Sequence, residues 1–187
     1  MESIELLIDE EEGFDGVFAI SLVEEPAIES NFIALSKHKV QMSVVDDEKR
    51  IVLGLALIPN KEILRVNKEG KPYNIFFSEK TVRDASQIYL REMRNKNTTF
   101  EHEMIVDGVY LSESWIVEDP EMDKTKLFNI DAPKGSWAIS MKVDNDSVWQ
   151  RVKNGEVLGF SIEGVFNDRP EDSEYKKKFN RIIEILS

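Results

Sequence analysis

The 187-residue sequence predicts a mainly β, α+β fold in which many short strands pack with one long amphipathic helix and one short helix. Three observations support this class. Runs of apolar, β-branched and aromatic residues recur between turn-forming residues along most of the chain. Apolar residues follow a helical spacing in only two segments. Most runs are short, and a closed or nearly closed β-barrel is the architecture we expect, because closure removes exposed strand edges.

Strands account for most of the expected elements. Residues 50–59 form an almost continuous apolar run that ends at Pro59, with a length typical of a buried strand. The turn-forming residues 67–70 separate two further runs and predict a hairpin. In chain order, the expected strands cover residues 18–23, 50–59, 62–66, 73–77, 98–102, 110–117, 136–143, 157–166 and 182–186.

Two helices are expected. Ser78 can cap a long helix that runs to about residue 95, with an inward face at steps of three and four that consists of Val82, Ala85, Tyr89 and Met93. Asp146 can cap a short helix over residues 147–153, which Gly155 follows. The inward residues of this second helix are expected to be Val148, Trp149 and Val152.

The chain length suits one domain with an appended arm. Residues 1–45 are expected to form an N-terminal arm or extension, since their start is acidic and is interrupted by glycines. The compact domain is expected over residues 46–187, from a polar turn onward.

Composition and charge exclude several classes of protein. The net charge of −12 repels phosphate backbones, so no nucleic-acid binding is expected. The sequence has no apolar run of membrane-spanning length and no signal peptide, which predicts a cytoplasmic protein without membrane contact. The absence of cysteine and the presence of only two histidines exclude thiolate and multi-histidine metal sites. We expect no cofactor and no metal, although an all-carboxylate Mg²⁺ or Ca²⁺ site stays open.

Ser161 is the candidate nucleophile, in the segment Gly159-Phe160-Ser161-Ile162-Glu163-Gly164. Alternation along a strand directs Phe160 and Ile162 to one face and Ser161 to the other, beside glycines that leave room for a substrate. Taken alone, the segment fits a surface serine on an amphipathic strand better.

His102 is the candidate general base, because the other histidine, His38, lies in a basic stretch of the expected arm. A neutral imidazole beside Ser161 could accept the hydroxyl proton and return it to the leaving amine. We expect Ser161 and His102 on neighbouring strands, within hydrogen-bond reach. Taken alone, a histidine between two glutamates better fits a solvated surface residue.

Four segments occur in a fixed order: Phe100-Glu101-His102-Glu103, Asp107-Gly108-Val109, Ser114-Trp115-Ile116-Val117-Glu118-Asp119-Pro120 and Gly159-Phe160-Ser161-Ile162-Glu163-Gly164. This ordered set resembles the prohead (capsid-maturation) serine proteases of tailed phages, relatives in fold of the herpesvirus assemblins. The resemblance covers about residues 50–187. It implies a protease barrel of the assemblin type, with Ser161 as nucleophile and His102 as base.

The third member of the triad must orient the imidazole, a role for a carboxylate or a second histidine, and the position of His38 in the expected arm disfavours the histidine. The resemblance implies a third member some two dozen residues after the serine, and Glu184 follows Ser161 by 23 positions. Glu184 is a lone charge in an apolar run, so it needs a partner if it faces inward, and an exposed strand edge is the alternative. The competing carboxylates are Glu163, Glu103, Glu118 and Asp119.

The resemblance also implies a substrate class and a setting. The protein would cleave scaffold and major capsid proteins, and itself, inside the phage prohead in the host cytoplasm, with the portal protein and a second copy of the chain as further candidate partners. In relatives, the strand of the third member continues as Ser-Leu-Val-x-x-Pro-Ala. Here that pattern stands at residues 21–27, with Ala19 where a glutamate would be, and either adds a strand to the barrel or serves as a processing arm.

Two other functions stay open. A virion structural or assembly protein could keep the protease fold without activity, and a β-barrel could bind small ligands or peptides without a phage role. An α/β-hydrolase is disfavoured, since the Gly-x-Ser-x-Gly elbow requires a second glycine where this chain has Glu163.

Overall fold

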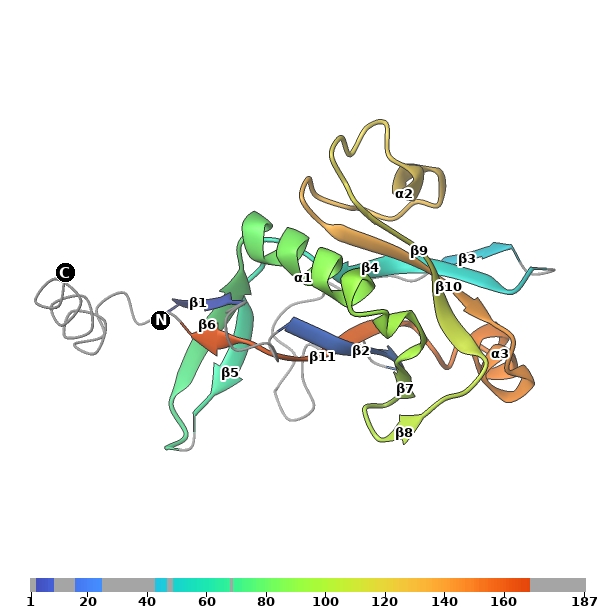
Figure 1. The fold of residues 1–187 in the computed structure, drawn as a ribbon, viewed down its shortest axis with the longest axis horizontal. Helices are drawn as coiled ribbons and strands as arrows, with labels where there is room; N and C mark the ends of the chain where they lie inside the picture. Colours follow the sequence, from blue (N-terminus) through green and yellow to red (C-terminus); the bar gives the residue numbers. More distant parts are fainter. Residues whose placement is uncertain (1–2, 9–15, 25–42, 47–48, 68, 169–187) are drawn as a thin grey trace, which may run out of the picture.

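The computed structural model of the chain describes residues 3–8, 16–24, 43–46, 49–67 and 69–168. Within these ranges the strands form three four-stranded sheets, accompanied by three α-helices (Figure 1). The first sheet has the order β12 (Asn167–Asp168), β1 (Ser3–Leu7), β6 (Pro72–Phe77), β5 (Ile63–Val66). The second has the order β3 (Ser43–Asp46), β4 (Ile51–Leu57), β10 (Trp137–Val143), β9 (Val109–Ile116). The third has the order β11 (Gly159–Val165), β2 (Gly16–Val23), β7 (Thr98–Phe100), β8 (Met104–Ile105).

The prediction of a closed or nearly closed barrel is wrong, although the chain is mainly β. None of the three sheets closes on itself within the described ranges. Two of the edge strands, β8 and β12, are only two residues long. Short edge strands limit unwanted pairing without closure, so the argument from exposed edges did not require a barrel.

The third sheet positions the candidate site. Strand β2 lies in its middle, antiparallel to β11 and parallel to β7. The register sets Phe160 opposite Leu22 and Leu22 opposite Phe100, and all three side chains are buried in the main core. Residues 21–23 of the pattern at residues 21–27 lie in β2, so this part of the pattern adds a strand to an open sheet, and residues 25–27 lie outside the described residues.

Helix α1 (Glu79–Arg91) covers one side of this core (Figure 1). Ser78 caps it as expected, since its side chain accepts a hydrogen bond from the Thr81 backbone N–H. The helix ends before residue 95 because Met93 adopts a left-handed conformation, with φ of 55°, and the chain enters the 3-10 helix η1 (Arg94–Lys96). Met93 is 83% exposed, so its expected place on the inward face is wrong.

The inward side of α1 is otherwise as expected. Val82, Ala85 and Tyr89 are fully buried. The Tyr89 ring packs edge to face on Trp137 of β10, with 5.5 Å between the ring centroids. Burial also raises the pKa of the Tyr89 hydroxyl well above its usual range, so this group stays protonated in the fold. The long helix is thus fixed over the same core that underlies β2 and β11.

Two shorter helices complete the fold. Helix α2 (Lys124–Leu127), which the sequence pattern did not predict, begins at Asp123, whose side chain accepts a hydrogen bond from the Thr125 N–H. Helix α3 (Asp146–Lys153) was predicted, but its cap is Asn145 and not Asp146. The Asn145 side-chain oxygen accepts hydrogen bonds from the backbone N–H groups of Ser147 and Val148. None of the helices in the described ranges is long and apolar enough to span a membrane.

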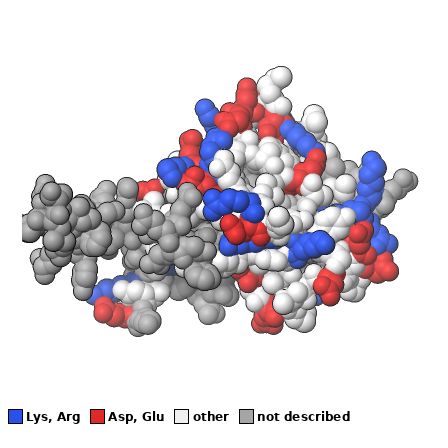
Figure 2. All heavy atoms as spheres, viewed as in Figure 1, with Lys and Arg blue, Asp and Glu red and all other residues white. Residues whose placement is uncertain are grey.

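Acidic and basic side chains are interspersed on the face of the molecule that Figure 2 shows. Several of them form ion pairs, such as that of Arg83 on α1 with Glu118 after β9. Exposed pairs of this kind contribute little to stability, commonly about 0–1 kcal/mol. The stability of the fold therefore rests mainly on the apolar core between the sheets and α1.

Candidate active site

Ser161 lies on β11 with its side chain on the face opposite to the main core. Phe160 on one side of it is 4% exposed and belongs to the core cluster, and Ile162 on the other side packs against that cluster. The expected alternation is therefore confirmed. Ser161 itself is 7% exposed and stands directly opposite Ser21 of β2. A short side chain on a strand that pairs with β2 and is anchored in the core by its neighbours has a well-defined position, as a nucleophile requires.

The sequence pattern predicted His102 in a strand, but it lies in a turn after β7. The strand ends at Phe100, and both Glu101 and His102 adopt left-handed conformations with φ of 50° and 58°. Such conformations are costly for residues other than glycine, on the order of 1–3 kcal/mol each. They persist here because β2 holds the turn: the Glu101 N–H donates to the Leu22 carbonyl, and the His102 N–H donates to the Ser21 hydroxyl over 3.0 Å.

The His102 ring is contacted by a carboxylate. The Nδ1 atom of His102 lies 3.2 Å from Oε1 of Glu163, which is two residues after Ser161 on the same face of β11. The Thr99 hydroxyl on β7 donates a hydrogen bond to the same Glu163 oxygen. Both side chains are about one third exposed, at 35% for His102 and 33% for Glu163. Because Nδ1 faces Glu163, Nε2 is the ring atom left for a second partner.

Ser161 and His102 border the same cavity, which has a volume of about 330 Å³. The expectation that they lie on neighbouring strands is wrong, because β2 lies between β11 and β7. Among the described residues, no hydrogen bond joins the Ser161 hydroxyl to the His102 ring. Catalytic hydrogen bonds are often long in unliganded enzymes and tighten when substrate binds. A hydroxyl and a carboxylate-oriented imidazole at one cavity are the components of serine acyl transfer.

The cavity lies where the three sheets meet. Its walls come from β1, β4, β5, β6 and β11 and are mostly aliphatic and aromatic. Lys61 and Arg65 also line it, but no aspartate or glutamate does among the described residues, although acidic residues outnumber basic ones in the chain. Burial lowers the pKa of the Lys61 amine. The cavity thus combines apolar walls with the positive charge of Arg65.

A family model described as "Putative phage serine protease XkdF" matches residues 39–169, well over half of the chain. The chain belongs to this family of phage serine proteases. The expected resemblance to the phage prohead proteases is thereby confirmed. Comparison with curated proteins and with solved structures gives no match. The part of this phage protease that matches the family includes His102, Ser161 and Glu163 and ends before Glu184.

The expected third member of the triad, Glu184, lies outside the described residues of the phage protease, so its role stays a prediction. The other candidate carboxylates are described. Glu118 forms an ion pair with Arg83 on α1, and the Asp119 side chain accepts a hydrogen bond from the Glu121 N–H. Glu103 is exposed. Of these competitors, Glu163 is the one whose carboxylate contacts the His102 ring within the described part.

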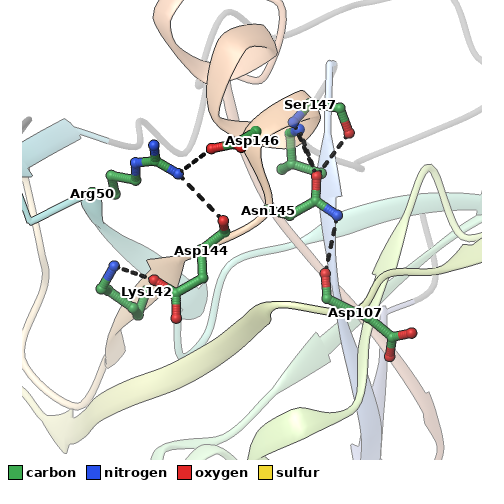
Figure 3. A network of polar contacts seen from close by, with 8 residues as sticks. Arg50, Asp107, Lys142, Asp144, Asn145, Asp146 and Ser147 are labelled. Carbon is green, nitrogen blue, oxygen red and sulfur yellow. Dashed lines mark hydrogen bonds and ion pairs between the residues drawn. The ribbon is translucent and has the colours of Figure 1, made fainter.

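The Asp107-Gly108 segment of the phage protease has a structural role (Figure 3). Gly108 adopts φ of 75°, and its carbonyl accepts hydrogen bonds from the backbone N–H groups of Asp144 and Asn145. The Asn145 side chain donates to the Asp107 carbonyl over 3.1 Å. A Cβ at Gly108 would lie 3.2 Å from the Asn145 nitrogen, so a side chain would crowd this contact. The turn thereby fixes the start of α3, the helix that precedes β11.

The sequence pattern gave no sign of two residues that shape the site of the phage protease. Ser21 holds the backbone of His102, and Thr99 holds the carboxylate of Glu163. Ser21 is a hydroxyl residue in an otherwise apolar strand and Thr99 is one of two threonines in β7, and the register sets both in line with Ser161 across the sheet. Polar residues on one face of neighbouring strands are a signal, but it can be used only once the pairing of the strands is known.

Proposed function

We propose that this phage serine protease is an endopeptidase of head maturation, which cleaves scaffold and capsid-protein segments and itself inside the prohead. The observation that supports the proposal best is that Ser161 and His102 border one apolar cavity in a chain of a phage serine protease family. The setting in the host cytoplasm follows from the same proposal.

The proposed reaction is an acyl transfer by Ser161. Its Oγ attacks the scissile carbonyl carbon while Nε2 of His102 accepts the hydroxyl proton, which gives a tetrahedral intermediate. His102 then returns the proton to the leaving amine as the C–N bond breaks, and the acyl group stays on Ser161. Water then attacks the acyl-enzyme while His102 accepts its proton, and His102 returns this proton to the Ser161 Oγ as the acyl C–O bond breaks and the carboxylate product leaves.

The cavity supports an extended peptide as substrate. Strand β11 is the edge of its sheet within the described ranges, and an edge strand can pair with an extended segment through main-chain hydrogen bonds. The volume of about 330 Å³ accommodates a large apolar side chain next to the scissile bond. Arg65, which lines the cavity, favours an acidic residue close to it.

A serine-directed fluorophosphonate probe tests the nucleophile without any known substrate. We expect labelling of the wild-type protein and none of Ser161→Ala, with Ser112→Ala as a matched control on β9 that keeps labelling. Ser112 donates a hydrogen bond to the Ser140 carbonyl and does not line the cavity. Labelling that persists in Ser161→Ala, or no labelling of wild type either alone or co-expressed with its head proteins, would refute the proposal.

Mass spectrometry of the co-expressed head proteins tests the substrate. We expect new termini that depend on Ser161, with large apolar and acidic residues within a few positions of each cut. Uncut head proteins in the presence of enzyme that reacts with the probe would contradict the proposed substrates and would favour a different peptide target.

A further inference from the structure

We infer that Glu163 is the positioning residue of His102 and orients its ring as the third member of the triad. The inference rests on the proposed function. The main support is the 3.2 Å contact between Glu163 Oε1 and His102 Nδ1. A carboxylate at Nδ1 holds the proton on that nitrogen and directs Nε2 to another partner.

The course of β11 explains how Glu163 reaches the ring. Glu163 is two residues after Ser161, so both side chains leave the strand on the same face. The residue directly opposite Glu163 on β2 is Ala19, whose single methyl group leaves room for the carboxylate to extend across β2 toward β7. The register of β11 against β2 also shifts between Glu163 and Gly164, and such irregularities re-aim a side chain.

A second group fixes the carboxylate itself. The Thr99 hydroxyl donates to the same oxygen that faces His102, so Oε1 of Glu163 is held from β7 while it accepts from the ring. Thr99 stands opposite Ser21 in the register, and Ser21 in turn holds the His102 backbone. The ring is therefore fixed at two points, through its backbone by β2 and through Nδ1 by β11.

This arrangement places the nucleophile and the carboxylate on one strand. The spacing of Ser161 and Glu163 is set by the geometry of β11, and His102 is brought to them by a turn that β2 holds. The ionised carboxylate would stabilise the imidazolium that forms when the Ser161 proton moves to Nε2. Glu163 acts through His102 and needs no contact with substrate.

The experiment compares the rate of fluorophosphonate labelling of Ser161 in the full-length wild type and four variants. We expect Glu163→Gln to label more slowly, by roughly 10²–10⁴-fold, the scale of acid-to-amide changes in other triads. Glu163→Asp, which keeps the charge, should recover part of the rate. Two matched controls make the same acid-to-amide change elsewhere. Glu103→Gln changes the exposed residue that follows His102, and Glu184→Gln changes the acid that the family resemblance implied. Both should label at nearly the wild-type rate.

A readout that does not depend on activity is the ¹⁵N spectrum of the histidine rings. The chain has only two histidines, so His38→Gln assigns the signals of His102. We expect the Nδ1–H tautomer of neutral His102 in the wild type and its partial loss in Glu163→Gln, since the hydrogen bond at one nitrogen selects the tautomer.

The outcomes separate the two ideas. A wild type that never labels at Ser161 refutes the proposed function, whatever the ring spectrum shows. Labelling of the wild type together with an equal rate for Glu163→Gln, or loss of labelling in Glu184→Gln alone, overturns the inference and leaves the proposed function standing. If Glu163→Gln does not fold, the wild-type spectrum decides, and an Nε2–H tautomer there overturns the inference.

Discussion

Gly164, at the end of the serine segment, lies so close to β2 that a side chain has no space. A Cβ added there would be 2.5 Å from the Gly16 carbonyl oxygen and 2.8 Å from the Phe166 ring. Ordinary contacts of a Cβ begin at 3.4 Å, so Gly164→Ala requires the two backbones to separate by several tenths of an ångström. The Phe166 ring can move aside, whereas the Gly16 carbonyl belongs to β2, which pairs with β11 next to this point.

The expected cost follows from this geometry. Forced overpacking of one methyl group typically destabilises a protein by about 1–3 kcal/mol, and a backbone obstacle puts Gly164→Ala in the upper part of that range. For a chain of this size, each kcal/mol corresponds to a fall of about 2–4 °C in Tm. Because Glu163 precedes the displaced residue, we also expect slower labelling of Ser161 by the fluorophosphonate probe.

Urea unfolding and thermal melting measure the loss of stability, with Val165→Ala as the control. Val165 is the next residue of β11 and is 49% exposed, so its truncation should change the free energy of unfolding by no more than about 0.5 kcal/mol. A Gly164→Ala protein that unfolds at the wild-type urea concentration would refute the close approach of β11 and β2, and with it the steric reason for this glycine.

Two further predictions concern the scaffold around the site. Asn145→Ala should lower the free energy of unfolding by about 1 kcal/mol, since two backbone N–H groups of α3 lose their acceptor. Asp146→Ala should lower it by less, because the side chain of Asp146 is exposed and its ion pair with Arg50 is therefore screened by water. Equal losses in urea unfolding would contradict the assignment of the cap. Hydrogen bonds from Lys124 and Ser140 lower the pKa of Glu113, so its ionised form stabilises the fold at neutral pH. This contribution is lost as the pH falls from the usual pKa of a glutamate through the lower pKa of Glu113 in the folded state. Glu113→Gln should therefore unfold more easily than wild type at pH 7 and equally easily at strongly acid pH, and a stability difference that does not depend on pH would contradict this.

Local sequence patterns predicted most of the elements because their signals lie within a few residues of one another. The cap at Ser78, the hairpin of β5 and β6 and the alternation around Ser161 each depend on neighbours in the chain, and each is confirmed. The errors also have local causes. Residues 98–102 have the composition of a strand, but the left-handed turn at His102 depends on a hydroxyl from β2, which no local window contains.

The barrel prediction was wrong for a different reason, and the same reason limits what the sequence says about the partners of the site residues. A barrel was expected because closure removes exposed strand edges, yet the described ranges form three separate sheets with short edge strands. It offered Glu184 from a family spacing, while the carboxylate found at the described His102 is Glu163. A spacing along the chain does not state which side chains meet, because strand pairing sets the distances between them.

The sequence by itself indicated the family of the protein and the face of the strand on which Ser161 lies, and it offered the residues that are proposed to carry the chemistry. The tertiary structure alone decided that β2 joins β11 to β7, that His102 meets Glu163, and that a cavity opens where three sheets converge. The physical reason is the range of the interactions. Capping, turns and alternation are fixed by nearby residues, whereas the pairing of Ser161 with Ser21 brings together segments that lie far apart in the sequence, and only the burial of a common core selects it.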